Sequence, residues 1–512
     1  MALRWLLDPG TRLATRTANA GVWAFALSMT GRILHFVRTL ILARLLAPDD
    51  FGLMAIAVIA LSLLETFTRT GFTQALIQRD GDITGHLDSA WTISVIRGVA
   101  LGIALFLVAP LVGQFFGTPE AVPLVQVLAV VSVLSGLKNV GVVFFDKELQ
   151  FRERFLYRSL PIAVDLVVSI GLALILQSVW ALVLGRIASQ AAMTIASFVA
   201  HPYRPRFRLE RDKVKDLYGF GMWITLSAIL LYFVENLDYI VVGRLLDPSD
   251  LGLYKMAFTI SALLSIEITW VVDQVVFPAL SKLQTDPKKL REGYLGTLEL
   301  VSVAALPAAA GLWFVGPTAV AILLGGKWLG LLPAYGALLI RGLFRSIGET
   351  TYPLFRSVGK PRITTVILLA TVILMASFLL PFTSAWGIAG AAWATVIASV
   401  PAVASLVVAA RMLNAGWIQL TRPIALPVVG AVLMLGVLAA AETVLPGGTW
   451  LLVWAPLLGL AVFLGFLMLA RRFLSYRPGH ALFSRLRSGG RDPLGLGGSA
   501  DLTPEGAERL VP

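Results

Sequence analysis

The chain has 512 residues, of which 57% are hydrophobic and only 14% are charged, with a mean hydropathy of +0.82. This composition excludes an ordinary soluble domain and predicts an all-α integral membrane protein, because lipid offers no hydrogen-bond partner to bare backbone groups. There is no cysteine, which excludes disulfides and thiol chemistry, and the net charge of +12 is interleaved with apolar runs, which favours membrane orientation over nucleic-acid binding.

Apolar runs along the chain predict about fourteen transmembrane helices, since crossing about 30 Å of hydrocarbon takes roughly 20 apolar residues. Residues 1–17 precede the first run and are expected to be a cytoplasmic lead-in, not a signal peptide. A first lobe over 18–200 is expected to hold six spans, near 18–42, 51–72, 89–113, 121–145, 156–177 and 180–200. A second lobe over 217–411 is expected to hold six more, near 217–242, 251–275, 295–324, 329–352, 363–383 and 386–410. The last pair falls within 420–472, near 423–443 and 449–470.

The distribution of positive charge predicts the orientation, because loops retained in the cytoplasm are rich in Lys and Arg. Alternate connectors are basic, whereas the intervening connectors GQFFGTPEAVP, QSVW, PFTSAWG and AETVLPGGTW carry no Lys or Arg. Both termini are therefore expected in the cytoplasm. Residues 201–216 form a predicted basic cytoplasmic linker between the lobes, and residues 473–512 a predicted cytoplasmic tail that is mostly disordered.

One short connector occurs twice in the chain. The stretch ARLLAPDDFGL at 43–53 returns as GRLLDPSDLGL at 243–253, and SVWALVLG at 178–185 is matched by SAWGIAGA at 384–391. In both copies of the first connector Pro ends an apolar run and Asp follows, where a carboxylate can cap free backbone amides. Because each lobe has six spans, an even number, the repeat is parallel, with its axis along the membrane normal and a cleft expected between the lobes.

Several stretches carry a family resemblance: DFGLMAIAVIALSLLETFTRTGFTQALIQRD at 50–80, VWALVLG at 179–185, GRLLDPSDLGLY at 243–254 and FPALSKLQ at 277–284. The sequence resembles polysaccharide exporters of the Wzx/WzxC type, in the multidrug/oligosaccharidyl-lipid/polysaccharide (MOP) superfamily, over roughly residues 15–470. The resemblance implies a bacterial inner-membrane flippase that moves undecaprenyl-pyrophosphate-type lipid-linked oligosaccharide to the periplasmic leaflet by alternating access, for O-antigen, capsule or exopolysaccharide assembly. Implied partners are this cargo, membrane lipids and polysaccharide polymerase or export machinery, with no nucleic acid.

Ionisable residues inside the predicted spans each need a partner, a water-filled cavity or a function, because they cost about 3 kcal/mol or more in lipid. The resemblance implies that the first, second, seventh and eighth spans line the cleft, so Arg32 and Arg38 are the leading candidates for binding the cargo pyrophosphate. The fixed fork of a guanidinium can form two charge-assisted hydrogen bonds to a phosphate. The other candidate cations for substrate binding are Arg97, Arg341 and Arg345.

Acidic residues in the seventh and eighth spans are candidates for a gate or for ion coupling, namely Glu235, Asp238, Glu267 and Asp273. At the repeat offset Arg38 corresponds to Asp238, which suggests that the two pair across the cleft in one state and part in the other. No catalytic residue and no metal site are expected, since the four histidines show no ligand spacing. The stretch GGKW at 325–328 has Trp after its Lys, so no ATP site or other cofactor is expected, and an ion gradient is left open as the energy source.

Structural interpretations of these charges stay open. Arg38 could snorkel to the outer interface, and Arg97 could be purely structural. Arg341, Arg345 and Glu349 share one helical face and could neutralise one another.

Rival functions also stay open. A lipid II flippase would carry a similar pyrophosphate cargo. A small-molecule efflux carrier for cations is disfavoured by the arginines of the first span. A membrane glycan polymerase or transferase is disfavoured because every predicted outer connector is short, so we expect a transporter and not an enzyme.

Overall fold

The computed structural model describes residues 30–68, 71–78, 83–148, 150–271 and 276–473. Every regular element in these ranges is helical, which confirms the all-α class. The predicted lead-in 1–17 and all but the first residue of the predicted tail 473–512 lie outside the described residues.

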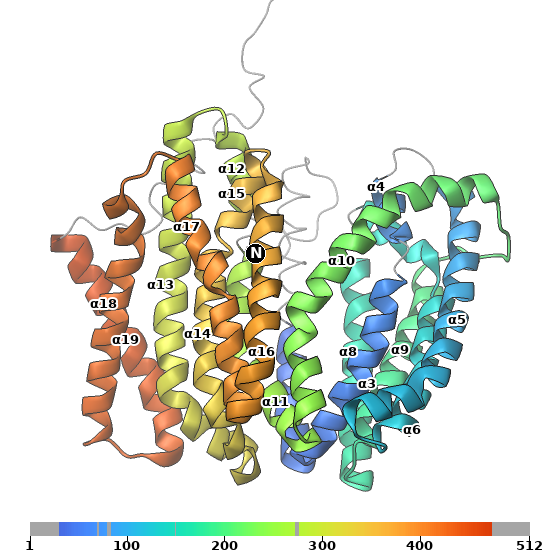
Figure 1. Cartoon of the computed structure of the whole chain (residues 1–512), viewed down its shortest axis with the longest axis horizontal. Helices are drawn as coiled ribbons and strands as arrows, with labels where there is room; N and C mark the ends of the chain where they lie inside the picture. The colour runs from blue at the N-terminus through green and yellow to red at the C-terminus, as the bar shows by residue number, and fades with distance from the viewer. Residues whose placement is uncertain (1–29, 69–70, 79–82, 149, 272–275, 474–512) are drawn as a thin grey trace, which may run out of the picture.

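Two bundles of helices stand side by side, with α10 (Arg211–Leu245) and α11 (Pro248–Val271) between them (Figure 1). The first bundle contains the helical segment 30–45, α3 (Pro48–Phe67), α4 (Phe72–Gln78), α5 (Thr84–Phe116), α6 (Ala121–Leu137), α7 (Val143–Lys147), α8 (Phe151–Leu176) and α9 (Trp180–Ala200). The second contains α12 (Phe277–Leu283), α13 (Pro287–Ala319), α14 (Leu332–Gly348), α15 (Thr351–Ser357), α16 (Pro361–Ala398), α17 (Val400–Met412), α18 (Trp417–Glu442) and α19 (Leu451–Phe473).

The chain is a multi-pass membrane protein. In the described ranges 8 helices are long and apolar enough to cross a membrane, or 9 if the bent pair Ala121–Leu137 and Val140–Lys147 forms one broken span. The number fourteen stays a prediction, because it also counts the helical segment 30–45, α10, α11 and α14 and divides 361–412 into two spans.

A break inside α16 lies where the sequence predicts the connector PFTSAWG. Trp386 and Gly387 leave the helical conformation there, and Gly387 has a φ of +57°. Glycine takes up a positive φ at little cost because it has no Cβ. The predicted boundary between the spans near 363–383 and 386–410 is therefore present as a break in the helix.

The start of α3 follows from its sequence. Pro48 stands in the first turn, where a missing N–H costs nothing, and the Ala47 backbone N–H donates to the Asp50 carboxylate at 2.9 Å. The predicted capping role of this Asp is confirmed.

The segment that connects the bundles is partly helical, and its predicted role as a cytoplasmic linker stays a prediction. Residues 201–210 have no regular structure, but α10 already begins at Arg211, so the last six residues of the predicted linker 201–216 are helical. The sequence RDKVKD places Asp and Lys three residues apart, a spacing that supports a helix in water.

One buried apolar cluster joins the two bundles. It includes Ile56 of α3, Tyr254 of α11 and Trp328, each with a fully buried side chain, together with residues of α10, α14 and α16. This shared core lies where the copies of the repeated connector meet.

Candidate functional site

The first charged group lies inside the first bundle and contains Arg38. Its Nε is 3.0 Å from the Asp165 carboxylate of α8, and its Nε and Nη2 donate to the Ser169 hydroxyl at 3.2 and 3.1 Å. The Arg38 side chain is only 13% exposed, so the ion pair is largely shielded from water. Sequence reasoning missed Asp165, although a single carboxylate in the apolar run PIAVDLVVSIGLAL was a visible signal.

Arg32 lies on the same helical segment as Arg38 and is half-buried, and His35 between them is exposed. Arg97 is elsewhere, on α5, where it donates to the Glu65 backbone carbonyl at 3.0 Å and to the Thr68 hydroxyl at 3.3 Å. The structure therefore separates Arg97 from the two leading candidates.

The second charged group lies in the other bundle and is centred on Arg345 of α14. Its Nη2 is 2.7 Å from the Glu235 carboxylate of α10, and its Nε donates to Glu349 at 2.7 Å. One turn earlier Arg341, with 9% of its surface exposed, lies over the Phe258 ring at 4.8 Å. The mutual neutralisation left open from sequence is confirmed for Arg345 and Glu349.

Asp238 is fully buried on α10, one turn from Glu235. It accepts hydrogen bonds from the Tyr254 hydroxyl at 3.0 Å and from the Tyr239 backbone N–H at 2.9 Å. Asp238 and Arg38 thus belong to separate networks in this structure, and their pairing stays a prediction for another state. The Glu267 side chain and all of Asp273 lie outside the described residues.

The repeated connector closes one end of the space between the bundles. A Cβ placed on Gly52 would lie 1.8 Å from the Pro248 carbonyl oxygen, and one placed on Gly252 would lie 1.9 Å from the Pro48 carbonyl oxygen. The two copies therefore pack backbone against backbone around the repeat axis, which explains why each needs glycine at the same place. This end is the one predicted to face the outside.

At the same end, side chains of each bundle donate hydrogen bonds to backbone carbonyls at helix ends of the other bundle. Lys327 Nζ donates to the carbonyls of Arg44 and Leu46 at 2.9 and 2.7 Å, and Trp328 Nε1 donates to that of Ala43 at 2.8 Å. Carbonyls at a helix C-terminus have no partner within the helix, so these contacts satisfy them.

Arg44 returns the contact to the second bundle. Its guanidinium donates to the backbone carbonyls of Ile322 and, at 2.7 Å, Leu323. An opening at this end would have to break all of these contacts together.

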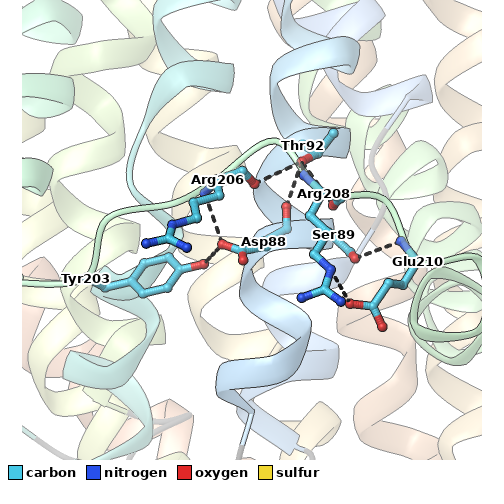
Figure 2. Close-up of polar contacts among 7 residues, drawn as sticks. All are labelled: Asp88, Ser89, Thr92, Tyr203, Arg206, Arg208 and Glu210. Atoms are coloured by element: carbon cyan, nitrogen blue, oxygen red, sulfur yellow. Dashed lines mark hydrogen bonds and ion pairs between the residues drawn. The ribbon is translucent and has the colours of Figure 1, made fainter.

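The linker between the bundles is hydrogen-bonded to the N-terminal turns of α5, and these contacts are called the strap below (Figure 2). The Asp88 carboxylate accepts from the Tyr203 hydroxyl and from the Arg206 backbone N–H at 3.0 Å. The Thr92 hydroxyl accepts from the Arg208 N–H at 3.1 Å, and the Ser89 hydroxyl accepts from the Glu210 N–H at 3.1 Å. Burial together with the nearby Asp88 carboxylate raises the pKa of Tyr203, so the tyrosine stays a neutral donor.

Metal binding finds no support in the residues that the structure describes, since they contain no group of three or more His, Cys, Asp or Glu side chains placed to hold an ion.

Comparison with known proteins gives the family. Residues 41–333 match the family described as polysaccharide biosynthesis protein. The chain belongs to this family. It is 25% identical over 339 residues to the lipopolysaccharide biosynthesis protein WzxC of Escherichia coli K12, covering 66% of this chain and 69% of that protein. It is 24% identical over 355 residues to the succinoglycan biosynthesis transport protein ExoT of Rhizobium meliloti, covering 69% and 72%.

The fold of this polysaccharide biosynthesis family member is similar to those of solved transporters. The lipid II flippase MurJ in an inward closed conformation superposes with a TM-score of 0.74 at 15% identity, covering 89% of this chain and all of that one. An inward-facing multidrug MATE transporter of the MOP superfamily gives 0.60 at 16% identity, covering 75% and 94%. The match over residues 41–333 thus confirms the predicted polysaccharide-export family, and these two structures show that the fold is that of such transporters.

Proposed function

We propose that the protein is a flippase that moves a polyprenyl-pyrophosphate-linked oligosaccharide between the leaflets of a bacterial inner membrane by alternating access. The relatives support transport for surface polysaccharide assembly, and the arginines of the helical segment 30–45 support an anionic cargo. We propose a cytoplasmic position for both termini because alternate connectors are basic. In this proposal the protein is a transporter without a catalytic site or cofactor.

The observation that carries the proposal is the guanidinium of Arg38 held inside the first bundle by Asp165 and Ser169. A phosphate oxygen accepts from a guanidinium as a carboxylate oxygen does, so a diphosphate can bind Arg38 in exchange for Asp165, whose carboxylate must then find another donor or a proton. Arg32 lies on the same helix, and we place both arginines against the cargo head group.

The reciprocal contacts at the repeated connector support alternating access. They consist of close backbone packing and a few hydrogen bonds, which two rigid bundles can break and re-form without unfolding. The Glu235 and Asp238 region, with its dense ionisable groups, is our candidate for coupling this motion to an ion gradient.

The test is the leaflet distribution of lipid-linked oligosaccharide in spheroplasts, measured with a membrane-impermeant glycan probe. Loss of the protein should abolish outside labelling in cells without a redundant flippase. Replacing Arg32 or Arg38 by Ala should lower the labelling rate by about 10-fold or more, as expected for loss of a charge-assisted hydrogen bond of about 1.5–3 kcal/mol. Arg362→Ala, at an exposed position on α16, is the matched control and should leave labelling unchanged.

Lys at position 38 separates charge from geometry. If bidentate recognition matters, Arg38→Lys should recover little of the lost rate. Wild-type labelling by well-expressed Arg32→Ala and Arg38→Ala variants would remove both residues from the cargo site. Unchanged labelling without the protein would refute flipping of this oligosaccharide and favour efflux or lipid II transport.

A further inference from the structure

A polar cavity lies inside the first bundle, away from Arg32 and Arg38. It has a volume of about 200 Å³ and is lined by residues of α3, α4, α5, α6, α7 and α8, by residues between α6 and α7, and by one residue of α9. A water molecule occupies roughly 30 Å³ in the liquid, so the cavity has room for a larger polar guest. Its charged lining residues are Arg97, Lys138, Arg154 and Arg158 with Glu65 and Asp146.

The lining has an excess of positive charge, four cations against two carboxylates. The Asp146 carboxylate forms ion pairs with two of the cations, at 2.8 Å from the Arg154 guanidinium and 3.7 Å from the Arg158 guanidinium. The side-chain ammonium of Lys138, at the C-terminal cap of α6, has no hydrogen bond or ion pair among the residues that the structure describes, whereas its backbone N–H donates to the Ser135 carbonyl. A shielded ammonium without a counter-ion calls for an anion.

A buried hydroxyl points to the same conclusion. Tyr157 of α8 lines the cavity with only 6% of its surface exposed, and within the described ranges no group accepts or donates a hydrogen bond at its hydroxyl. Leaving such a group unsatisfied costs about 1–3 kcal/mol. The hydroxyl and the Lys138 ammonium are therefore two donors, in one cavity, that lack an acceptor.

The walls of the cavity are preformed. On the side of α5 and α6, a Cβ on Gly98 would lie 2.7 Å from the Ser132 carbonyl oxygen, so these two helices are in backbone contact. On the other side the cavity reaches solvent near Arg158, whose side chain is 45% exposed. That rim carries the basic residues that predict the cytoplasmic face.

We propose that this cavity binds a phosphate group, taken either from an anionic lipid head group or from free phosphate or diphosphate at the predicted cytoplasmic face. Forked guanidinium groups, an ammonium and a hydroxyl donor match the three oxygens of a phosphate. The excess of cations excludes a metal or organic cation as the guest. The site is separate from the arginines of the proposed function, and its test needs no transport.

The experiment measures binding to the purified full chain. Isothermal titration in detergent uses inorganic pyrophosphate as the soluble probe. Native mass spectrometry of nanodiscs made from phosphatidylcholine, with or without phosphatidylglycerol, tests the lipid source. The variants are Lys138→Gln and Tyr157→Phe, with Lys360→Gln on the exposed surface as the matched control.

Wild type is expected to bind at least one of the two probes. Lys138→Gln should weaken binding by about 10-fold or more, and Tyr157→Phe, which keeps the packing and removes one hydroxyl, by about 2- to 10-fold. Lys360→Gln should bind as wild type does. Binding of pyrophosphate alone or of phosphatidylglycerol alone supports the proposal and identifies the source.

Two results would overturn the proposal. One is a wild-type chain that binds neither probe. The other is a folded Tyr157→Phe or Lys138→Gln variant that binds as tightly as wild type, because the anion would then lie elsewhere.

Discussion

The contact between the two copies of the repeated connector can be tested by adding a single methyl group. An alanine Cβ at Gly52 would lie 1.8 Å from the Pro248 carbonyl oxygen, whereas ordinary contacts begin at 3.4 Å. The two helix ends must therefore move apart by the difference, about 1.6 Å. The added methyl group meets backbone atoms, and a change of side-chain rotamer cannot relieve that clash.

Overpacking of this kind costs about 1–3 kcal/mol. The cost applies only while the connectors touch, so it acts on the equilibrium between closed and open forms and not on each bundle by itself. A bias of 1–3 kcal/mol changes that ratio by about 5- to 150-fold. Gly252→Ala should act in the same direction, since the contact is reciprocal.

The assay is the labelling of one introduced cysteine in intact cells by a membrane-impermeant maleimide. The chain has no cysteine of its own, so Ala55→Cys, at a position that is 1% exposed in the shared core, reports without background. Gly52→Ala should raise its labelling rate several-fold over the otherwise unchanged chain. Gly171→Ala on α8, where a Cβ meets nothing within 4 Å, is the matched control.

Equal labelling rates in the Gly52→Ala and Gly171→Ala chains would refute the reasoning. So would a rise that accompanies a large loss of folded protein, because the methyl group would then be disturbing the fold and not the closure.

Three further predictions concern the charged and polar contacts. Arg345→Gln removes the cation that Glu235 and Glu349 share, and it should destabilise the protein by about 2 kcal/mol in thermal unfolding. This is less than the 3–5 kcal/mol of a fully buried pair because Arg345 is 30% exposed. Arg362→Gln should have no effect. Burial lowers the pKa of His201, whose Nδ1 accepts the Tyr203 N–H at 3.2 Å. As pH falls, His201 therefore takes up a proton in the unfolded chain before it does so in the folded protein. The free energy of unfolding should decrease as pH drops below about 6.5. Thermal unfolding measured against pH should show a flatter dependence for His201→Gln. Asp88→Asn weakens the strap shown in Figure 2 and should speed trypsin cleavage after the linker arginines, with Asp286→Asn cleaved at the wild-type rate.

The sequence by itself determined the class of protein and much of its local structure. Membrane insertion requires helices of about 20 apolar residues, so composition and run length were enough to predict an all-α membrane protein. Local rules likewise predicted the Asp50 cap and a connector at PFTSAWG, and they left the Arg345–Glu349 pair open as an alternative, because each depends on residues within a few positions of one another.

Only the tertiary structure decided which distant residues meet. The partner of Arg38 is Asp165, 127 positions away, and no pattern in the sequence distinguishes it from Asp238, the partner suggested by the repeat. The repeat predicted that Gly52 and Gly252 are equivalent positions but not that the two connectors are in contact. Two positions related by a symmetry axis can lie at any distance from that axis. The polar cavity depends in the same way on helices α3 to α9 packing around Lys138 and Tyr157, and side-chain burial of this kind is fixed by packing and not by local sequence.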